Sequence, residues 1–322
     1  MITLKEINNQ NLIVVENLLL ERNITIPEYV HWKYEQNDDS FRGAIAFVDG
    51  EPAGCFGLIP RELKINSSKT VMCGWFADWY VSPRFRGLKI GQNLLNEISE
   101  VYPITFGHPG PAAAQKICKK NGYKEIVFQS RRRMMIHPWH YARFRTRNPF
   151  KIMALGLPNT LRFNLQNVIT EDRQSLTDES TFEDWISFID DTAYQDWIYS
   201  QPCSSSMATR EWKKWEDDDL RIFYTIDHLM TGERRSLVLH FDGSSIYSMR
   251  AWRKFIIFIH KIGVIYVDIF TTNPKIDQIW MSMGAKRIIE SPVLVKNLQA
   301  ETQLDLHGWD RENWTFLASR RE

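Results

Sequence analysis

Hydrophobic and polar positions in the first 135 residues follow two different periods. Apolar residues at helical spacing predict an amphipathic helix over 8–21, and the apolar run 43–49 predicts a strand. Asp49-Gly50 favours a tight hairpin after that strand, because a type I′ turn needs positive φ at both central residues. The return strand is expected over 52–59.

The pattern continues with alternating strands and helices. A third strand is predicted over 75–81, and Pro83 ends it. The elements that follow are a helix from Gly91, a short strand at 104–106, a helix over 112–120 closed by Asn121-Gly122, and a strand over 123–135. This order predicts a mixed α/β layer.

The C-terminal part repeats two segments of the N-terminal part. Residues 29–34 resemble 194–199, and 117–124 resemble 279–286. The two offsets, 165 and 162 residues, are nearly equal. We therefore expect a tandem repeat of one α/β domain.

Residues 139–180 differ in character and are expected to connect two domains, 1–138 and 181–322. The connecting segment combines Trp139 with several arginines and ends in a polar stretch. Its arginine and aromatic residues favour either a phosphate-binding or membrane-surface patch over 139–151, or a solvated linker packed on the sheet. The linker is the preferred interpretation.

Composition excludes several classes of protein. The 322 residues carry a formal charge of +1, which argues against a dedicated nucleic-acid binder. Four cysteines without CxxC spacing indicate neither a zinc site nor a redox pair, so no metal is expected. The first residues lack a signal-peptide pattern and no apolar run is long enough to span a bilayer, so we expect a cytoplasmic protein without an integral membrane segment.

Residues 86–91, Arg-Gly-Leu-Lys-Ile-Gly, lie between a predicted strand and a predicted helix. Backbone N–H groups at a helix N-terminus converge on one point, and the helix dipole adds positive charge there. A pyrophosphate suits such a site, and glycines allow its close approach. Taken alone, the loop could also be a mere tight connection.

The surrounding sequence resembles the acyl-CoA-binding motif of the GNAT N-acetyltransferase superfamily. Residues 81–95 match its strand ending in Val-x-Pro and its Arg-x-x-Gly-x-Gly loop, and 114–123 resemble its second motif. The resemblance implies acetyl-CoA or another acyl-CoA as co-substrate, and two such domains in tandem with the second one degenerate. It assigns cofactor binding to these residues: Trp79, Tyr80, Val81, Arg84, Arg86, Gly87, Leu88, Lys89, Ile90 and Gly91.

The sequence departs from the family pattern at three positions. Lys89 replaces the central glycine, Cys118 stands where a helix tyrosine often protonates the leaving thiolate, and Pro111 replaces an asparagine. These changes affect the catalytic groups more than the fold.

By resemblance, an amine attacks the thioester directly, and a backbone N–H near Val81 stabilises the oxyanion. Asp78 is the candidate base, since it is the one carboxylate in an apolar strand; a solvated or Arg-paired aspartate is equally expected. His108 is a candidate assistant, or a loop histidine without a role. Cys118 is a candidate proton donor, or a small buried residue.

The second domain lacks a counterpart of the 86–91 loop, so one CoA site is predicted, with the second domain walling the acceptor pocket. The acceptor is expected to be the amine of a small molecule or sugar. The alternatives are a non-catalytic acyl-CoA-binding protein, and an aminoacyl transferase that uses charged tRNA. The oligomeric state is left open.

Overall fold

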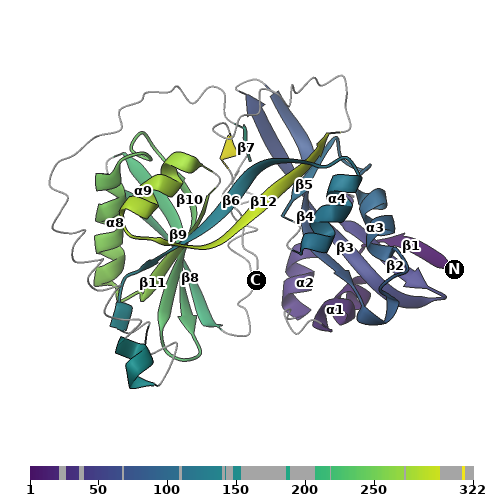
Figure 1. Ribbon diagram of the computed structural model, residues 1–322, viewed down its shortest axis with the longest axis horizontal. Coiled ribbons are helices and arrows are strands. Elements are labelled where there is room, and N and C mark those ends of the chain that lie inside the picture. Colours follow the sequence, from purple (N-terminus) through teal and green to yellow (C-terminus); the bar gives the residue numbers. More distant parts are fainter. Residues whose placement is uncertain are drawn as a thin grey trace.

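The computed structural model describes residues 1–21, 27–35, 40–66, 69–108, 111–139, 142, 148–153, 186–188, 207–217, 219–271, 273–297 and 314–315. Figure 1 shows two α/β halves bridged by two long strands. What we call the N-terminal half comprises β1 (Ile2–Glu6), α1 (Leu12–Leu20), α2 (Pro27–Tyr34), β2 (Gly43–Val48), β3 (Glu51–Asn66), β4 (Lys69–Val81), η1 (Pro83–Phe85), α3 (Ile90–Ile98), β5 (Ile104–Gly107) and α4 (Ala112–Lys120).

The C-terminal half repeats the later part of this order. It comprises β8 (Met207–Asp217), β9 (Leu220–Leu229), β10 (Arg234–Asp242), α8 (Met249–Lys261), β11 (Tyr266–Thr271) and α9 (Pro274–Ser282). Three strands, a helix, a strand and a helix thus match β2, β3, β4, α3, β5 and α4. The structure confirms the mixed α/β fold and the tandem arrangement expected from the sequence.

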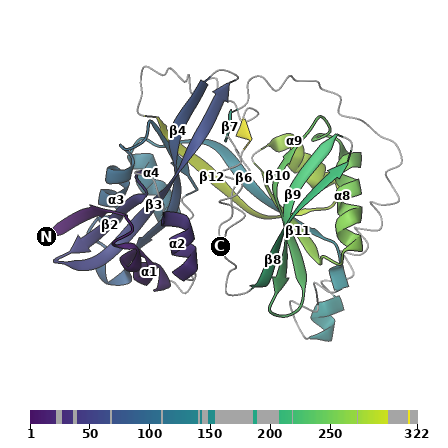
Figure 2. The ribbon, with the colours of Figure 1, turned by 180° about the vertical axis from the view of Figure 1, so that it is seen from behind.

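Helices cover the N-terminal sheet on both faces. Residues of α1 and α2, including Val15 and Val30, pack on one face with Ile45 and Cys55. Residues of α3 and α4 pack on the other face with Phe56 and its neighbours, and Figure 2 shows the molecule from the side opposite to Figure 1. The Asp49-Gly50 turn has φ of 50° and 87°, as the expected type I′ geometry requires.

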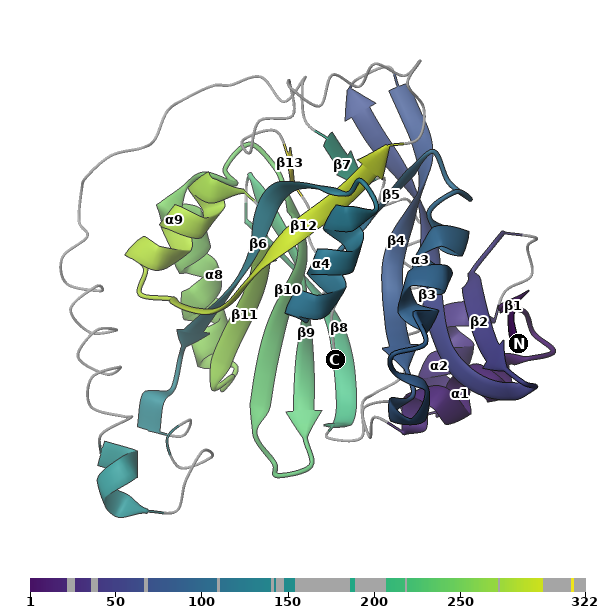
Figure 3. The ribbon, with the colours of Figure 1, turned by 45° about the vertical axis from the view of Figure 1, so that its right-hand side comes forward.

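Strands β6 (Lys124–Met135) and β12 (Lys286–Asn297) cross between the halves (Figure 3). The strand order is β1-β2-β3-β4-β5-β12-β6-β11-β10-β9-β8. Strand β12, which follows α9, pairs antiparallel with β5, and β6, which follows α4, pairs antiparallel with β11. Each half therefore supplies a strand to the other half's sheet.

Ion pairs hold β6 on the C-terminal half. Arg131 and Arg133 both donate to the buried carboxylate of Asp268 on β11, and Arg132 pairs with Asp277 of α9. Met134 of the same strand lies in the C-terminal core. The short strands β7 (Ile186–Phe188) and β13 (Trp314–Thr315) pair with each other, and β7 also pairs with β3. The predicted domain boundaries stay a prediction.

Candidate functional site

The loop after β4 leads directly into α3. The single 3₁₀ turn at Pro83–Phe85 follows the strand, Gly87 has φ of 93°, and α3 begins at Ile90. Lys89 has φ of 59°, so a lysine adopts the left-handed conformation at the position where the family motif has glycine. The loop conformation is therefore kept although the glycine is not.

No side chain caps the N-terminus of α3, and no acidic residue stands in its first turn. The N–H groups of that turn, which have no partner within a helix, point out of its end. Arg86 and Lys89 are exposed, and neither forms an ion pair among the described residues. Arg84 is bound by Glu51. Two cations and a helix end thus lie together, an arrangement that suits an anion.

Strand β4 carries a bulge in front of this loop. Cys55 pairs with Tyr80 and Gly57 with Ala77, so Asp78 and Trp79 share one position opposite β3. Asp78 has φ of 35°, an uncommon conformation for a residue with a side chain. The parallel pairing of β4 with β5 ends at Trp75–Phe106, whereas β4 continues to Val81. The two strands therefore diverge beside the bulge.

The Asp78 carboxylate receives two hydrogen bonds from α2. The Lys33 ammonium lies 2.7 Å and the Tyr34 hydroxyl 2.6 Å from the same oxygen, Oδ2. Burial lowers the pKa of Lys33, but the Asp78 carboxylate and the Tyr29 hydroxyl outweigh it, so that pKa lies above its usual value. Burial and the same carboxylate raise the pKa of Tyr34 well above its usual value. Asp78 is thus half-buried and ion-paired.

The side chains of the remaining cofactor candidates serve mostly in packing. Trp79 stacks on Phe56 with ring centroids 4.5 Å apart, and a Cβ at Gly91 would lie 3.4 Å from its indole nitrogen. Tyr80 donates to Glu21, and Ile90 is buried in the core. Leu88 is exposed on the loop.

His108 and Cys118 lie in different surroundings from Asp78. His108 is buried against the Trp75 ring, and its Nδ1 lies 3.3 Å from the carbonyl oxygen of Pro292 on β12. Cys118 is the fully buried residue of α4, and burial raises its thiol pKa to about 12. Tyr123 is buried and hydrogen-bonded to Thr105, and burial raises its pKa. Asp78 thus contacts α2, whereas His108 contacts Trp75 and Pro292, and Cys118 is buried in the core with α3.

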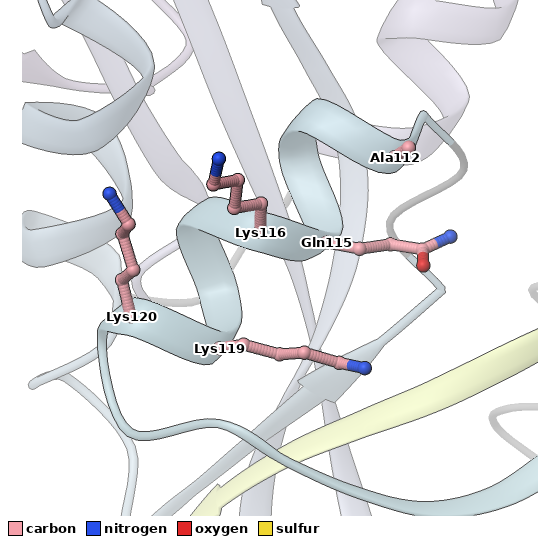
Figure 4. A pocket seen from close by; sticks show the side chains of 5 residues that line it. All are labelled: Ala112, Gln115, Lys116, Lys119 and Lys120. Atoms are coloured by element: carbon pink, nitrogen blue, oxygen red, sulfur yellow. The ribbon is translucent and has the colours of Figure 1, made fainter.

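The exposed side of α4 lines a shallow recess of about 430 Å³ (Figure 4). Its lining residues are Ala112, Gln115, Lys116, Lys119 and Lys120. Figure 4 shows Lys116 and Lys120 on one side of the helix and Lys119 on another. Lys119 is paired with Glu125, and Gln92 of α3 donates to Asn121 just after α4. None of the residues expected to bind the cofactor lines this recess.

Lys33 and Tyr34 are the site residues that the sequence analysis missed. The run 29–34 stood out only as one member of a repeated pair, and its partner 194–199 lies outside the described residues. A lysine and a tyrosine adjacent in a short helix carry no signal of their own. The lone carboxylate at 78 was the clue, because a buried aspartate needs a nearby donor.

A family model described as "Acetyltransferase (GNAT) family" matches residues 13–103. The match spans α1 to α3 and contains both the bulge and the loop. Residues 13–103 therefore match a GNAT acetyltransferase domain. No sequence match to a curated protein was found.

Several solved structures resemble nearly the whole chain, including the matched domain. A GCN5-related N-acetyltransferase from Anabaena variabilis has a TM-score of 0.59 at 15% identity, covering 93% of this chain and 73% of its own. A probable N-acyltransferase from Enterococcus faecalis gives 0.56 at 10%, with 94% and 74% covered. Saccharomyces cerevisiae N-myristoyltransferase, solved with myristoyl-CoA, gives 0.54 at 9%, with 98% and 84% covered. At these identities the likeness establishes the fold of the two halves.

Two further observations concern membrane-spanning helices and metal-binding groups. Within the described ranges, no helix combines the length and apolarity needed to cross a bilayer. The described histidines, cysteines and acidic residues form no group of three or more that could hold a metal ion.

Proposed function

We propose that this protein is an acyl-CoA-dependent N-acyltransferase that transfers an acetyl or other acyl group to the amine of a small molecule or sugar. One observation carries the proposal: α3 begins without a cap, beside the cations Arg86 and Lys89, where bulged β4 diverges from β5. The pyrophosphate of the acyl-CoA binds at the helix end, and its pantetheine follows the free edge of β4 near Val81.

The amine nitrogen attacks the thioester carbon, the carbonyl oxygen becomes an oxyanion, and the C–S bond then breaks to release CoA. A backbone N–H at the bulge donates to the oxyanion, and Asp78 accepts the proton of the attacking amine, directly or through water. Lys33 favours the ionised, proton-accepting form of Asp78. Assistance by His108 and proton donation by Cys118 remain predictions.

Calorimetric titration with acetyl-CoA tests the loop. Arg86→Glu replaces an attraction for the pyrophosphate by a repulsion, and we expect a loss of about 1.5–3 kcal/mol, roughly 10- to 100-fold in Kd. Ser244→Glu is the matched control, since Ser244 is exposed in the loop that precedes α8. Equal affinity of Arg86→Glu and the unchanged protein would remove the loop from the CoA site.

A non-catalytic acyl-CoA-binding protein is the second candidate. The engagement of Asp78 by Lys33 and Tyr34 and the full burial of Cys118 favour it. Mass spectrometry of a broad amine panel after incubation with acetyl-CoA separates the two functions. Acylated product that disappears in Asp78→Asn supports the enzyme; tight acetyl-CoA binding without any product supports the binding protein.

A further inference from the structure

Helix α2 contacts the bulge through two adjacent residues. Lys33 and Tyr34 end this helix, and their polar atoms meet at a single oxygen of Asp78. The Lys33 ammonium also lies 4.3 Å from the centroid of the Tyr29 ring. The Lys33 side chain is 9% exposed, and the Asp78 side chain 19%. The contact is therefore an ion pair largely removed from water.

The backbone around this contact adopts a conformation that needs support. Asp78 holds its φ of 35° in the bulge, where it shares one position opposite β3 with Trp79. The Cys55 thiol on β3 approaches the Asp78 carbonyl oxygen at 3.6 Å. Such backbone strain persists where the surrounding contacts define the conformation. Lys33 and Tyr34 supply strong contacts of this kind, because charge-assisted hydrogen bonds are short and directional.

The position of the Tyr34 hydroxyl also depends on a glycine of β3. A Cβ at Gly57 would lie 2.0 Å from the Tyr34 hydroxyl oxygen. The absent side chain at Gly57 thus leaves the space through which the hydroxyl reaches Asp78 past strand β3. The geometry links α2, β3 and the β4 bulge into one arrangement.

We propose that Lys33 and Tyr34 are positioning residues, which hold the Asp78 bulge in the conformation that aims its backbone N–H groups at the thioester carbonyl. This inference rests on the proposed function, because it concerns the thioester end of the same acyl-CoA site. The loop at 86–91 binds the phosphates independently of α2. Loss of the α2 contact therefore changes how the carbonyl is polarised and leaves the affinity for CoA itself unaltered.

The ¹³C NMR signal of acetyl-CoA labelled at the thioester carbonyl tests the proposal. A hydrogen bond to the carbonyl oxygen moves this signal downfield on binding. We expect a clear downfield shift with the unchanged protein, a smaller shift with Tyr34→Phe and with Lys33→Met, and partial recovery with Lys33→Arg. Calorimetry with CoA should give the same Kd for all four proteins.

Two further variants control for unfolding of the site and for the loss of an ion pair as such. Lys33→Met leaves a charge on Asp78 that can unfold the site, so Lys33→Met with Asp78→Asn removes both charges and should fold while still losing the shift. Lys254→Met, which removes an exposed ion pair with Asp217, is the matched control and should keep the full shift. A full shift in Tyr34→Phe and the double variant, or no shift in the unchanged protein despite binding, overturns the inference. Absence of any acetyl-CoA or CoA binding by the unchanged protein instead overturns the proposed function.

Discussion

The two halves treat the N-termini of their equivalent helices in opposite ways. In the N-terminal half, neither α3 nor α4 has a side-chain cap. In the C-terminal half, Ser248 caps α8 and Asn273 caps α9. A capped helix end has its N–H groups satisfied by the protein, whereas an open end keeps them for a ligand. The half with open ends is also the half that contains the match to the GNAT acetyltransferase family.

The scaffold beneath these helix ends is the same in both halves. Strand β10 has a register shift between Val238 and His240, at the place where β4 has its bulge, and its parallel pairing with β11 ends at Val238–Ile269. The loop that precedes α8 differs from the loop that precedes α3 in the packing of its side chains. Ile246 is buried in the core, and Asn273 donates to the Tyr247 hydroxyl, which joins the starts of α8 and α9. The two halves therefore share the bulge and the divergence of strands, and they differ in what occupies the N-termini of the following helices.

Separating the halves should have the largest effect. Residues 1–138 alone lack β12, so β5 and β6 lose their shared neighbour, and β6 loses Asp268. We expect this fragment to be aggregated or unfolded by size-exclusion chromatography and circular dichroism, and to recover structure when coexpressed with 139–322. A monomeric fragment that unfolds cooperatively would show that the halves are independent.

Removing a helix cap should destabilise the protein only where a cap exists, which is in the C-terminal half. The Asn273 side chain accepts from the N–H groups of Lys275 and Ile276, so Asn273→Ala should cost about 1–2 kcal/mol in the free energy of unfolding. Pro111→Ala, at the uncapped start of α4, should change it by less than about 0.5 kcal/mol. Urea denaturation measures both. Similar values would abolish the distinction between capped and open ends.

The pH dependence of stability tests the buried position of Cys118 on α4, which corresponds to that of Trp280 on α9. Burial raises the Cys118 pKa from 9.0 to about 12, so the folded state binds its proton more tightly than the unfolded state. This contribution is complete below pH 9 and is lost between pH 9 and 12, at about 1.4 kcal/mol per pH unit at most. Cys118→Ala should flatten the decline in unfolding free energy between pH 8.5 and 10, where the thiol begins to titrate. An unchanged slope would place the thiol in water.

The smallest effect is expected at Lys89. Relief of its left-handed conformation stabilises Lys89→Gly by about 1 kcal/mol, and the gain in unfolded-state entropy offsets most of it. We expect unchanged stability within about 0.5 kcal/mol, and a loss of severalfold in acetyl-CoA affinity from the missing cation. Lys89→Arg is the control that keeps the charge. Strong destabilisation by glycine, measured by calorimetry, would contradict the conformational role.

Local patterns predicted most of the N-terminal elements, since each follows from its own residues. The apolar period identified α1, Asp49-Gly50 identified the turn, and Pro83 with Gly87 identified the loop before α3. The match of 117–124 with 279–286 marks equivalent segments, because both run from a helix into a crossing strand. It also aligns Cys118 with Trp280, and both side chains are fully buried. That position is a core position in each half.

The features that sequence reasoning missed depend on distant contacts. Strand β1 and helix α2 were not predicted, and β3 and β4 are longer than expected. The exchange of β6 and β12 has no local signature, because an amphipathic strand looks the same whichever sheet receives it. The ion pair of Asp78 with Lys33 spans 45 residues of sequence. Most of 139–180, with its arginine-rich patch, lies outside the described residues.

The strand exchange also determines when each sheet can be completed during synthesis of the chain. A ribosome makes β5 and β6 early, but β12, which lies between them, is finished only at Asn297. The edge of β5 that pairs with β12 therefore stays open until β12 has emerged, although domains usually fold as they are made. The N-terminal half is translated before the C-terminal half, but by this geometry its sheet is completed only after the C-terminal half has been made.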